Sequence, residues 1–151
     1  MGISTVPITR ETAFTAVTQA LDLIAKLDPR RMRRMRHDLH RIVIGRRPTS
    51  FSVIGRACYL DSTELSRSTG IVALSLVHEA VHARFARAGV LPSGRNAARE
   101  EVRCNREELA FLDRMEAAGW SSIPKLRSWL QDTRARDAER VVAVSFEPPA
   151  V

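Results

Sequence analysis

The sequence predicts a mainly helical α+β fold, and three patterns in its 151 residues point to that class. Apolar side chains recur at helical spacing over three stretches, residues 9–27, 70–88 and 96–118. Short β-leaning runs lie between residues 42 and 60 and predict a few strands. A hydrophobic content of 44% is ordinary for a globular chain, so we expect a single domain, residues 1–151, around one core.

The N-terminal part of that domain, residues 9–47, is predicted to be helical and rich in arginine. Its first helix carries apolar side chains at helical spacing, namely Phe14, Val17, Leu21 and Ile24. Asp28 and Pro29 then interrupt the pattern. Pro29 suits the first turn of a second helix, because that turn leaves backbone N–H groups unbonded and proline has none to offer.

The middle of the chain, residues 51–118, is predicted to hold the functional core. Three β-leaning runs separated by glycine and proline precede or open it, at residues 42–44, 51–54 and 57–60. We expect these runs to form a small antiparallel sheet. A polar, turn-rich stretch over residues 61–70 then leads into the apolar helix.

The C-terminal half is predicted to contain two more helices. Residues 89–94 form a loop rich in helix breakers, and the long helix after it should end at Gly119. Pro124 fits the first turn of a last helix that reaches about residue 136. Two prolines near the C-terminus favour an extended tail over residues 141–151.

The pattern His78-Glu79-Ala80-Val81-His82 lies within the apolar helix predicted over residues 70–88. Side chains four residues apart lie on one face of an α-helix, so both imidazoles can reach a single metal ion. Glu79 points beside that site, where a carboxylate can deprotonate a water. This arrangement on a helix is typical of zinc peptidases. We therefore predict a Zn²⁺ cofactor, with His78 and His82 as ligands and Glu79 as the general base.

A catalytic zinc site usually takes three protein ligands, so the next predicted helix should supply the third. Projected at about 100° per residue, Glu101 and Glu108 fall on the apolar side with Cys104. Glu100 and Glu107 fall away from that side. Carboxylates on a core-facing stripe are costly unless they are paired or bound to metal. Glu101 is therefore the favoured third ligand, which completes a known two-His-one-Glu zinc set.

Glu108 is the alternative third ligand, and its position leaves two further roles open. It could accept a hydrogen bond from a ligating histidine and orient that ring, or it could form a salt bridge with an arginine. The role of Cys104 is open between a ligand for a soft metal and a buried, inert thiol, and we favour the inert thiol. The candidate ligands also have a purely structural interpretation. Each histidine could be a hydrogen-bonded core residue, and each glutamate could belong to a buried salt bridge.

His78-Glu79-x-x-His82, the β-leaning segment before it and a glutamate on the next helix resemble the gluzincin branch of the zincin metallopeptidases. The resemblance covers residues 59–115. It implies hydrolysis of peptide or protein substrates by a zincin-like core, in which a small antiparallel sheet packs on the motif helix and the ligand helix. It also implies an edge strand that holds an extended peptide, and residues 57–60 are the best candidate.

The formal net charge of +7 raises the question of an acidic partner. Eight arginines crowd residues 30–47, which predicts either a solvated helix surface or a docking site for an acidic partner or nucleic acid. This segment contains no aromatic residue and no recognisable nucleic-acid-binding motif, which weakens the nucleic-acid interpretation. The alternative function is a basic nucleic-acid- or protein-binding regulatory module, in which the metal site is structural, degenerate or absent.

No membrane contact is expected. The apolar run around the motif is short and is interrupted by Ser75, Glu79 and Arg84. The N-terminus shows no signal-peptide pattern. The two cysteines, Cys58 and Cys104, do not make a disulfide framework. We therefore expect a reducing, cytoplasmic setting.

Overall fold

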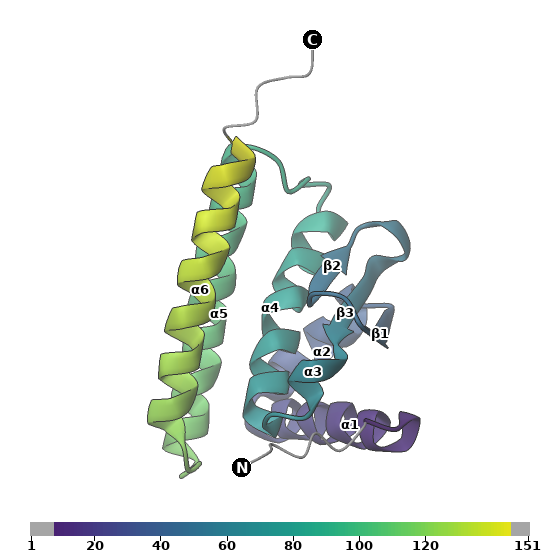
Figure 1. Cartoon of the computed structure of the whole chain (residues 1–151), viewed down its shortest axis with the longest axis vertical. Helices are drawn as coiled ribbons and strands as arrows, with labels where there is room; N and C mark the ends of the chain where they lie inside the picture. Colours follow the sequence, from purple (N-terminus) through teal and green to yellow (C-terminus); the bar gives the residue numbers. More distant parts are fainter. Residues whose placement is uncertain (1–7, 146–151) are drawn as a thin grey trace, which may run out of the picture.

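The structure, a computed structural model, describes residues 8–145 and is built mainly from helices (Figure 1). Its helical elements are α1 (Arg10–Leu27), α2 (Pro29–Asp38), the 3-10 turn η1 (Ile54–Arg56), α3 (Ser62–Leu65), α4 (Thr69–Arg87), α5 (Arg95–Ala117) and α6 (Ile123–Ser145). The predicted mainly helical α+β class is confirmed. The helices α1, α4 and α5 begin and end within one residue of the predicted stretches.

Side-chain caps explain where three of these helices begin. Thr9, Asp28 and Ser68 each accept a hydrogen bond from a backbone N–H three residues further on. Such a bond satisfies one of the donors that the first turn of a helix leaves free. Pro29 follows Asp28 in the first turn of α2, as predicted. Local sequence is therefore sufficient to fix these starting points.

The three strands form one small mixed sheet. β1 (Arg41–Gly45), β2 (Ser50–Ser52) and β3 (Ala57–Asp61) lie in the order β1-β3-β2. β3 runs parallel to β1 and antiparallel to β2, so the prediction of an antiparallel sheet is wrong. The chain turns back into β3 at Gly55, whose φ of 75° is a conformation that glycine adopts readily. Strand propensity does not specify which strands pair, and here the last strand inserts between the first two.

The C-terminal helix is longer than predicted. α6 continues through Ser145, past the expected end near residue 136, so the predicted extended conformation is wrong for residues 141–145. Residues 146–151 of the predicted tail lie outside the described residues.

α4 is the central helix of the fold. It contacts α1, α2, α5 and the strands, and in Figure 1 it lies between the α5–α6 pair and the sheet. Its Leu74, Leu76 and Val77 are almost completely buried although they point in different directions around the helix axis. Packing on several sides explains its nearly continuous apolar run. Of the helices that the structure describes, none combines the length and apolar character that crossing a bilayer requires.

α1 packs against α4 along a narrower stripe than its sequence predicts. Val17 and Ile24 are buried, but Phe14 is 73% exposed. The buried residues of α1 are Ala13, Val17, Ala20, Leu23 and Ile24. Helical spacing identifies an apolar side of the helix, but the neighbouring element decides how much of that side is covered.

α5 and α6 run side by side as a long antiparallel pair (Figure 1). The N-terminal end of α4 lies against this pair at Gly70. A Cβ atom at Gly70 would come within 2.9 Å of Leu126 and 3.1 Å of Met115. The missing side chain therefore allows α4 to approach both helices closely, with the histidines of α4 further along the same helix.

Candidate metal centre

His78 and His82 lie one turn apart on α4 and point the same ring atom toward each other. Their Nε2 atoms are 3.1 Å apart, and their ring planes meet at 65°. The two side chains are 6% and 16% exposed. The structure thus brings the two imidazoles together at one buried point, as their spacing predicts.

Two side chains of α5 face the same point. Glu101 places its Oε1 atom 3.1 Å from Nε2 of His82 and its Oε2 atom 3.5 Å from Nε2 of His78. The Sγ atom of Cys104 lies 3.6 Å from Nε2 of His82. One ligand atom from each of these four residues lies within 4.8 Å of the others, which is close enough to hold a metal ion.

A carboxylate lies beside the other nitrogen of each imidazole. Nδ1 of His82 is 2.9 Å from Oε2 of Glu100, and Nδ1 of His78 is 2.8 Å from Oε1 of Glu108. The contact of His82 with Glu100 is a hydrogen bond, whereas Nδ1 of His78 lies close to Glu108 without hydrogen-bond geometry. An ionised carboxylate only accepts, so it favours the proton on the neighbouring Nδ1, and Nε2 of a neutral ring then keeps a lone pair. Two such lone pairs repel at 3.1 Å unless a proton or a metal cation lies between them. This histidine–carboxylate pairing is the usual support of metal-binding histidines.

One oxygen of the third predicted ligand is also consistent with a cation. Oε2 of Glu101 is buried and has no hydrogen-bond partner among the residues that the structure describes. Buried polar atoms are normally satisfied, so such an atom needs an explanation. A metal ion between Glu101 and the two imidazoles would supply the missing interaction.

Glu108 lies next to a histidine and forms the salt bridge with an arginine that was one of its predicted roles. Arg134 of α6 donates from Nε to Oε2 of Glu108 at 2.7 Å and from Nη2 to Oε1 at 2.5 Å. Glu108 is completely buried and lies on the Nδ1 side of His78, whereas the four clustered ligand atoms lie on the Nε2 side. The geometry therefore makes Glu101, and not Glu108, the carboxylate that faces the centre.

Glu100 and Glu107 are both buried, which corrects the prediction that they face away from the core. They are 2% and 9% exposed. Glu100 contacts His82, and Glu107 accepts a hydrogen bond from Nη1 of Arg31 at 2.6 Å. The physical reason is that α4 covers one side of α5 while the Arg31 side chain of α2 covers another. The buried arc of α5 is therefore wider than its apolar stripe.

The carboxylates around the two imidazoles favour a positive charge there. Burial lowers the pKa of His78, but contacts with Cys104 and Glu108 outweigh burial and raise this pKa to about 10. Burial likewise lowers the pKa of His82, and contacts with Cys104 and Glu101 raise it to about 12. The negative potential that holds a proton on these rings also favours a metal cation.

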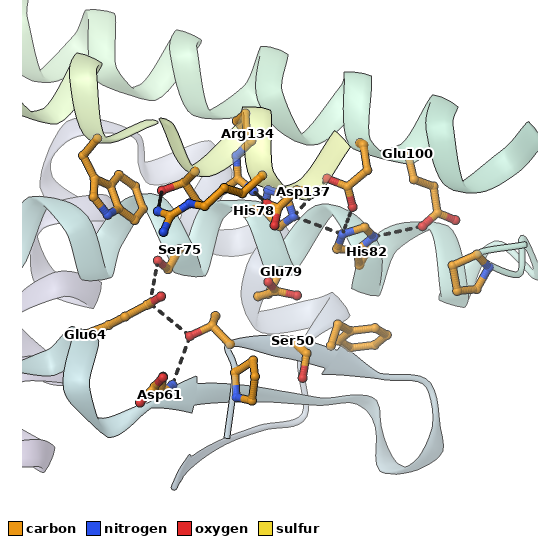
Figure 2. A pocket seen from close by; sticks show the side chains of 18 of the residues that line it. Ser50, Asp61, Glu64, Ser75, His78, Glu79, His82, Glu100, Arg134 and Asp137 are labelled. Atoms are coloured by element: carbon orange, nitrogen blue, oxygen red, sulfur yellow. Dashed lines mark hydrogen bonds and ion pairs between the residues drawn. The ribbon is translucent and has the colours of Figure 1, made fainter. Parts of the chain in front are cut away.

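Glu79 lines a cavity together with both histidines (Figure 2). The cavity has a volume of about 540 Å³, and its walls include residues of β2, α3, α4, α5 and α6. In Figure 2 the Glu79 carboxylate lies on the side of the imidazoles that faces the strands. Burial raises the pKa of Glu79, and the charges of His78 and His82 oppose that shift. A raised pKa brings a carboxyl group closer to the range in which it exchanges protons at neutral pH.

β3 is the centre of the sheet, which corrects its predicted role as the strand beside the substrate. It pairs with β1 on one side and with β2 on the other, so residues 57–60 offer no free edge. The cavity is instead bordered by β2, through Ser50 and Phe51. The guanidinium carbon of Arg47 lies 3.8 Å from the ring centroid of Tyr59, so this tyrosine stacks on an arginine.

The site also includes residues that the sequence did not single out. Glu64 forms a polar wall of the cavity and accepts hydrogen bonds from Thr49 at 3.0 Å and from Ser75 at 3.1 Å (Figure 2). Arg134 reaches the same cavity from α6. Neither residue belongs to a motif, and each comes from an element whose packing partner could not be read from local spacing.

No protein-family model, curated protein or solved structure matches this chain. The interpretation of the centre therefore depends on its own residues and their geometry.

Proposed function

We propose that the protein is a small zinc-dependent metallopeptidase of the zincin type, which hydrolyses a peptide bond in a peptide or protein substrate. The observation that carries the proposal is the convergence of His78, His82 and Glu101 at one buried point. Glu79 lines the same cavity. α4 would thus supply two ligands and the general base, and the neighbouring α5 would supply the third ligand.

Zinc is the metal that this donor set favours. Two imidazole nitrogens and one carboxylate form a known catalytic zinc set, and a nearby thiol is also a zinc donor. Magnesium and calcium prefer sites made only of oxygen atoms. The carboxylates on Nδ1 of His78 and His82 would hold the rings in the orientation that a metal needs.

The chain's own residues would move the protons of the reaction. A zinc ion bound here supplies a Lewis acid and lowers the pKa of an attacking water. Glu79 would take a proton from that water and pass it to the leaving amine. The cavity of about 540 Å³ leaves room for an extended segment of substrate between β2 and α6. The thiols of Cys58 and Cys104 are both free, which suits the cytoplasmic location that we propose.

The first test is the zinc content of purified protein. We expect about one zinc per chain, and we expect His78→Ala to lose it because one of the converging nitrogens is gone. His37→Ala is the matched control, since the His37 side chain is 61% exposed and lies on α2. Metal-free, well-folded wild-type protein would reject the proposal.

The second test separates metal binding from catalysis. Glu79→Gln should keep zinc and lose hydrolysis of a peptide library, because glutamine cannot accept the proton. Cleavage by Glu79→Gln at the wild-type rate would show that Glu79 is not the base. Glu116→Gln, at an exposed position on α5, should cleave normally.

A second candidate, a basic module that binds nucleic acid, is favoured by a separate cavity of about 430 Å³. Arginines from α2 and α5 line it together with Asp28, which pairs with two of them; the arginines are Arg30, Arg31, Arg33, Arg34 and Arg114. In this function the metal site would be structural, degenerate or absent. Labelled single-stranded DNA should then bind with an affinity that falls steeply with salt, and Arg33→Glu should weaken binding. Absence of binding at low salt rejects this candidate.

A further inference from the structure

Cys104 lies on α5 at a position from which its side chain can reach the same metal ion as Glu101. It follows Glu101 by three residues, so both side chains lie on the same face of the helix. That face meets the histidines of α4, and Cys104 is completely buried against them. α4 and α5 would thus each contribute two donors, in one turn of helix each.

The contacts of the thiol are polar. Its Sγ atom lies 3.6 Å from Nε2 of His82 and 3.7 Å from the backbone oxygen of His78. Cys58, the second cysteine, is equally buried but lies on β3, outside the four-residue cluster found among the described residues. Burial alone therefore does not distinguish the two thiols, whereas the surroundings of Sγ do.

The separations agree with the edges of a zinc tetrahedron. Zinc bonds of about 2.0 Å to nitrogen and about 2.3 Å to sulfur place two nitrogens about 3.3 Å apart, and nitrogen and sulfur about 3.5 Å apart. The corresponding separations here are 3.1 Å between the imidazoles of His78 and His82 and 3.6 Å between His82 and Cys104. Oε1 of Glu101 lies 3.1 Å from the imidazole of His82, and Oε2 of Glu101 lies 3.5 Å from the imidazole of His78. One ligand atom from each of the four side chains lies within 4.8 Å of the others, so the four can close on one ion.

We infer that Cys104 supplies a thiolate as the fourth protein ligand of the metal, which closes the site in the conformation that the structure represents. Four protein ligands are typical of structural zinc sites, whereas catalytic sites keep one position open for water. If the peptidase function proposed above holds, this conformation is a latent form. Cys104 must then leave the metal before water can bind, and the protein restrains its own activity.

The ligand assignment can be tested without measuring activity. Cobalt(II) bound to a thiolate shows strong sulfur-to-metal charge-transfer absorption in the near ultraviolet. We expect this band in cobalt-loaded wild-type protein and in Cys58→Ser. We expect Cys104→Ser to bind cobalt but to lose the band, because an alcohol cannot give that transition. Circular dichroism shows whether each variant is folded, and Cys104→Ala is a second variant if the serine variant is not.

The outcomes distinguish this inference from the proposed function. Cobalt-loaded wild-type protein without the band, or Cys104→Ser that retains it, overturns the inference. If the band depends on Cys104 but neither wild type nor variant cleaves peptides, the ligand is established and the peptidase proposal fails. If both hold, zinc-loaded Cys104→Ala cleaves faster than wild type. Equal rates would overturn the latent form.

Discussion

Glu100 decides how His82 presents its ring to the centre. The 2.9 Å contact between Oε2 of Glu100 and Nδ1 of His82 keeps the proton on Nδ1 and the lone pair on Nε2. Groups that orient a ligand in this way typically change metal affinity when they are replaced. Glu100 thus belongs to the candidate site although it is not one of the four clustered ligand residues.

We predict that Glu100→Gln weakens zinc binding by about 10-fold to 100-fold. Glutamine can still occupy the position but carries no charge to hold the imidazole. Competition with a chromophoric chelator measures the affinity, and Glu116→Gln serves as the exposed control on the same helix. Unchanged affinity in Glu100→Gln would mean that the contact is incidental.

At the residue scale, the sequence predicted the cluster of His78, His82 and Glu101 and offered Glu108 as a supporting residue, but it missed the supporting role of Glu100. The spacing of His78, Glu79 and His82 is enough to predict where their side chains meet, because four residues make about one helical turn. Glu101 was predicted by projecting the next helix. Glu100 was placed on the wrong side, since the projection assumes that only the apolar stripe of a helix is buried.

At the scale of secondary-structure elements, an ion pair between Arg134 of α6 and Glu108 of α5 links α6 to the candidate centre. The Arg134 side chain is 14% exposed, and it donates twice to Glu108, which is completely buried. Glu108 in turn contacts His78. The C-terminal helix α6 thus helps, through Glu108, to hold His78 in place.

We predict that Arg134→Ala destabilises the fold by about 3 kcal/mol, because it leaves the Glu108 carboxylate buried without its main partner. Denaturant unfolding of the metal-free protein measures this loss. Arg127→Ala is the matched control on the same helix, since Arg127 pairs with the exposed Glu116 and such surface pairs contribute about 0–1 kcal/mol. Equal effects of the two substitutions would contradict the prediction.

Across the whole molecule, a buried charge network joins the N-terminal helices to α5. Arg31 donates to Asp28 at 3.1 Å and to Glu107 at 2.6 Å. Burial raises the pKa of Asp28, but the backbone N–H and the charge of Arg31 outweigh it, so the pKa is lowered below 3.8. Burial also raises the pKa of Glu107, but the hydrogen bond and the charge of Arg31 have the larger effect, so this pKa is lowered below 4.5.

Stability should therefore fall in acid. A carboxylate whose pKa is lower in the folded than in the unfolded chain stabilises the fold above its unfolded pKa and loses that contribution as pH falls through its folded pKa. We predict that the free energy of unfolding declines below about pH 4.5. Denaturant titrations at a series of pH values measure the decline, which should be shallower in Glu107→Gln. A profile identical to wild type would exclude Glu107 as a contributor.

The sequence by itself determined the extents of α1, α4 and α5 and the positions of the histidine pair, because these depend on neighbours within a turn or two of the chain. Only the tertiary structure decided that β3 lies in the middle of the sheet and that α6 delivers Arg134 to Glu108. The same holds for the thiol of Cys104, whose position was predictable but whose contact with His82 was not. The reason is that local spacing fixes the direction of a side chain from its own helix, whereas the group it meets depends on contacts between segments distant in sequence.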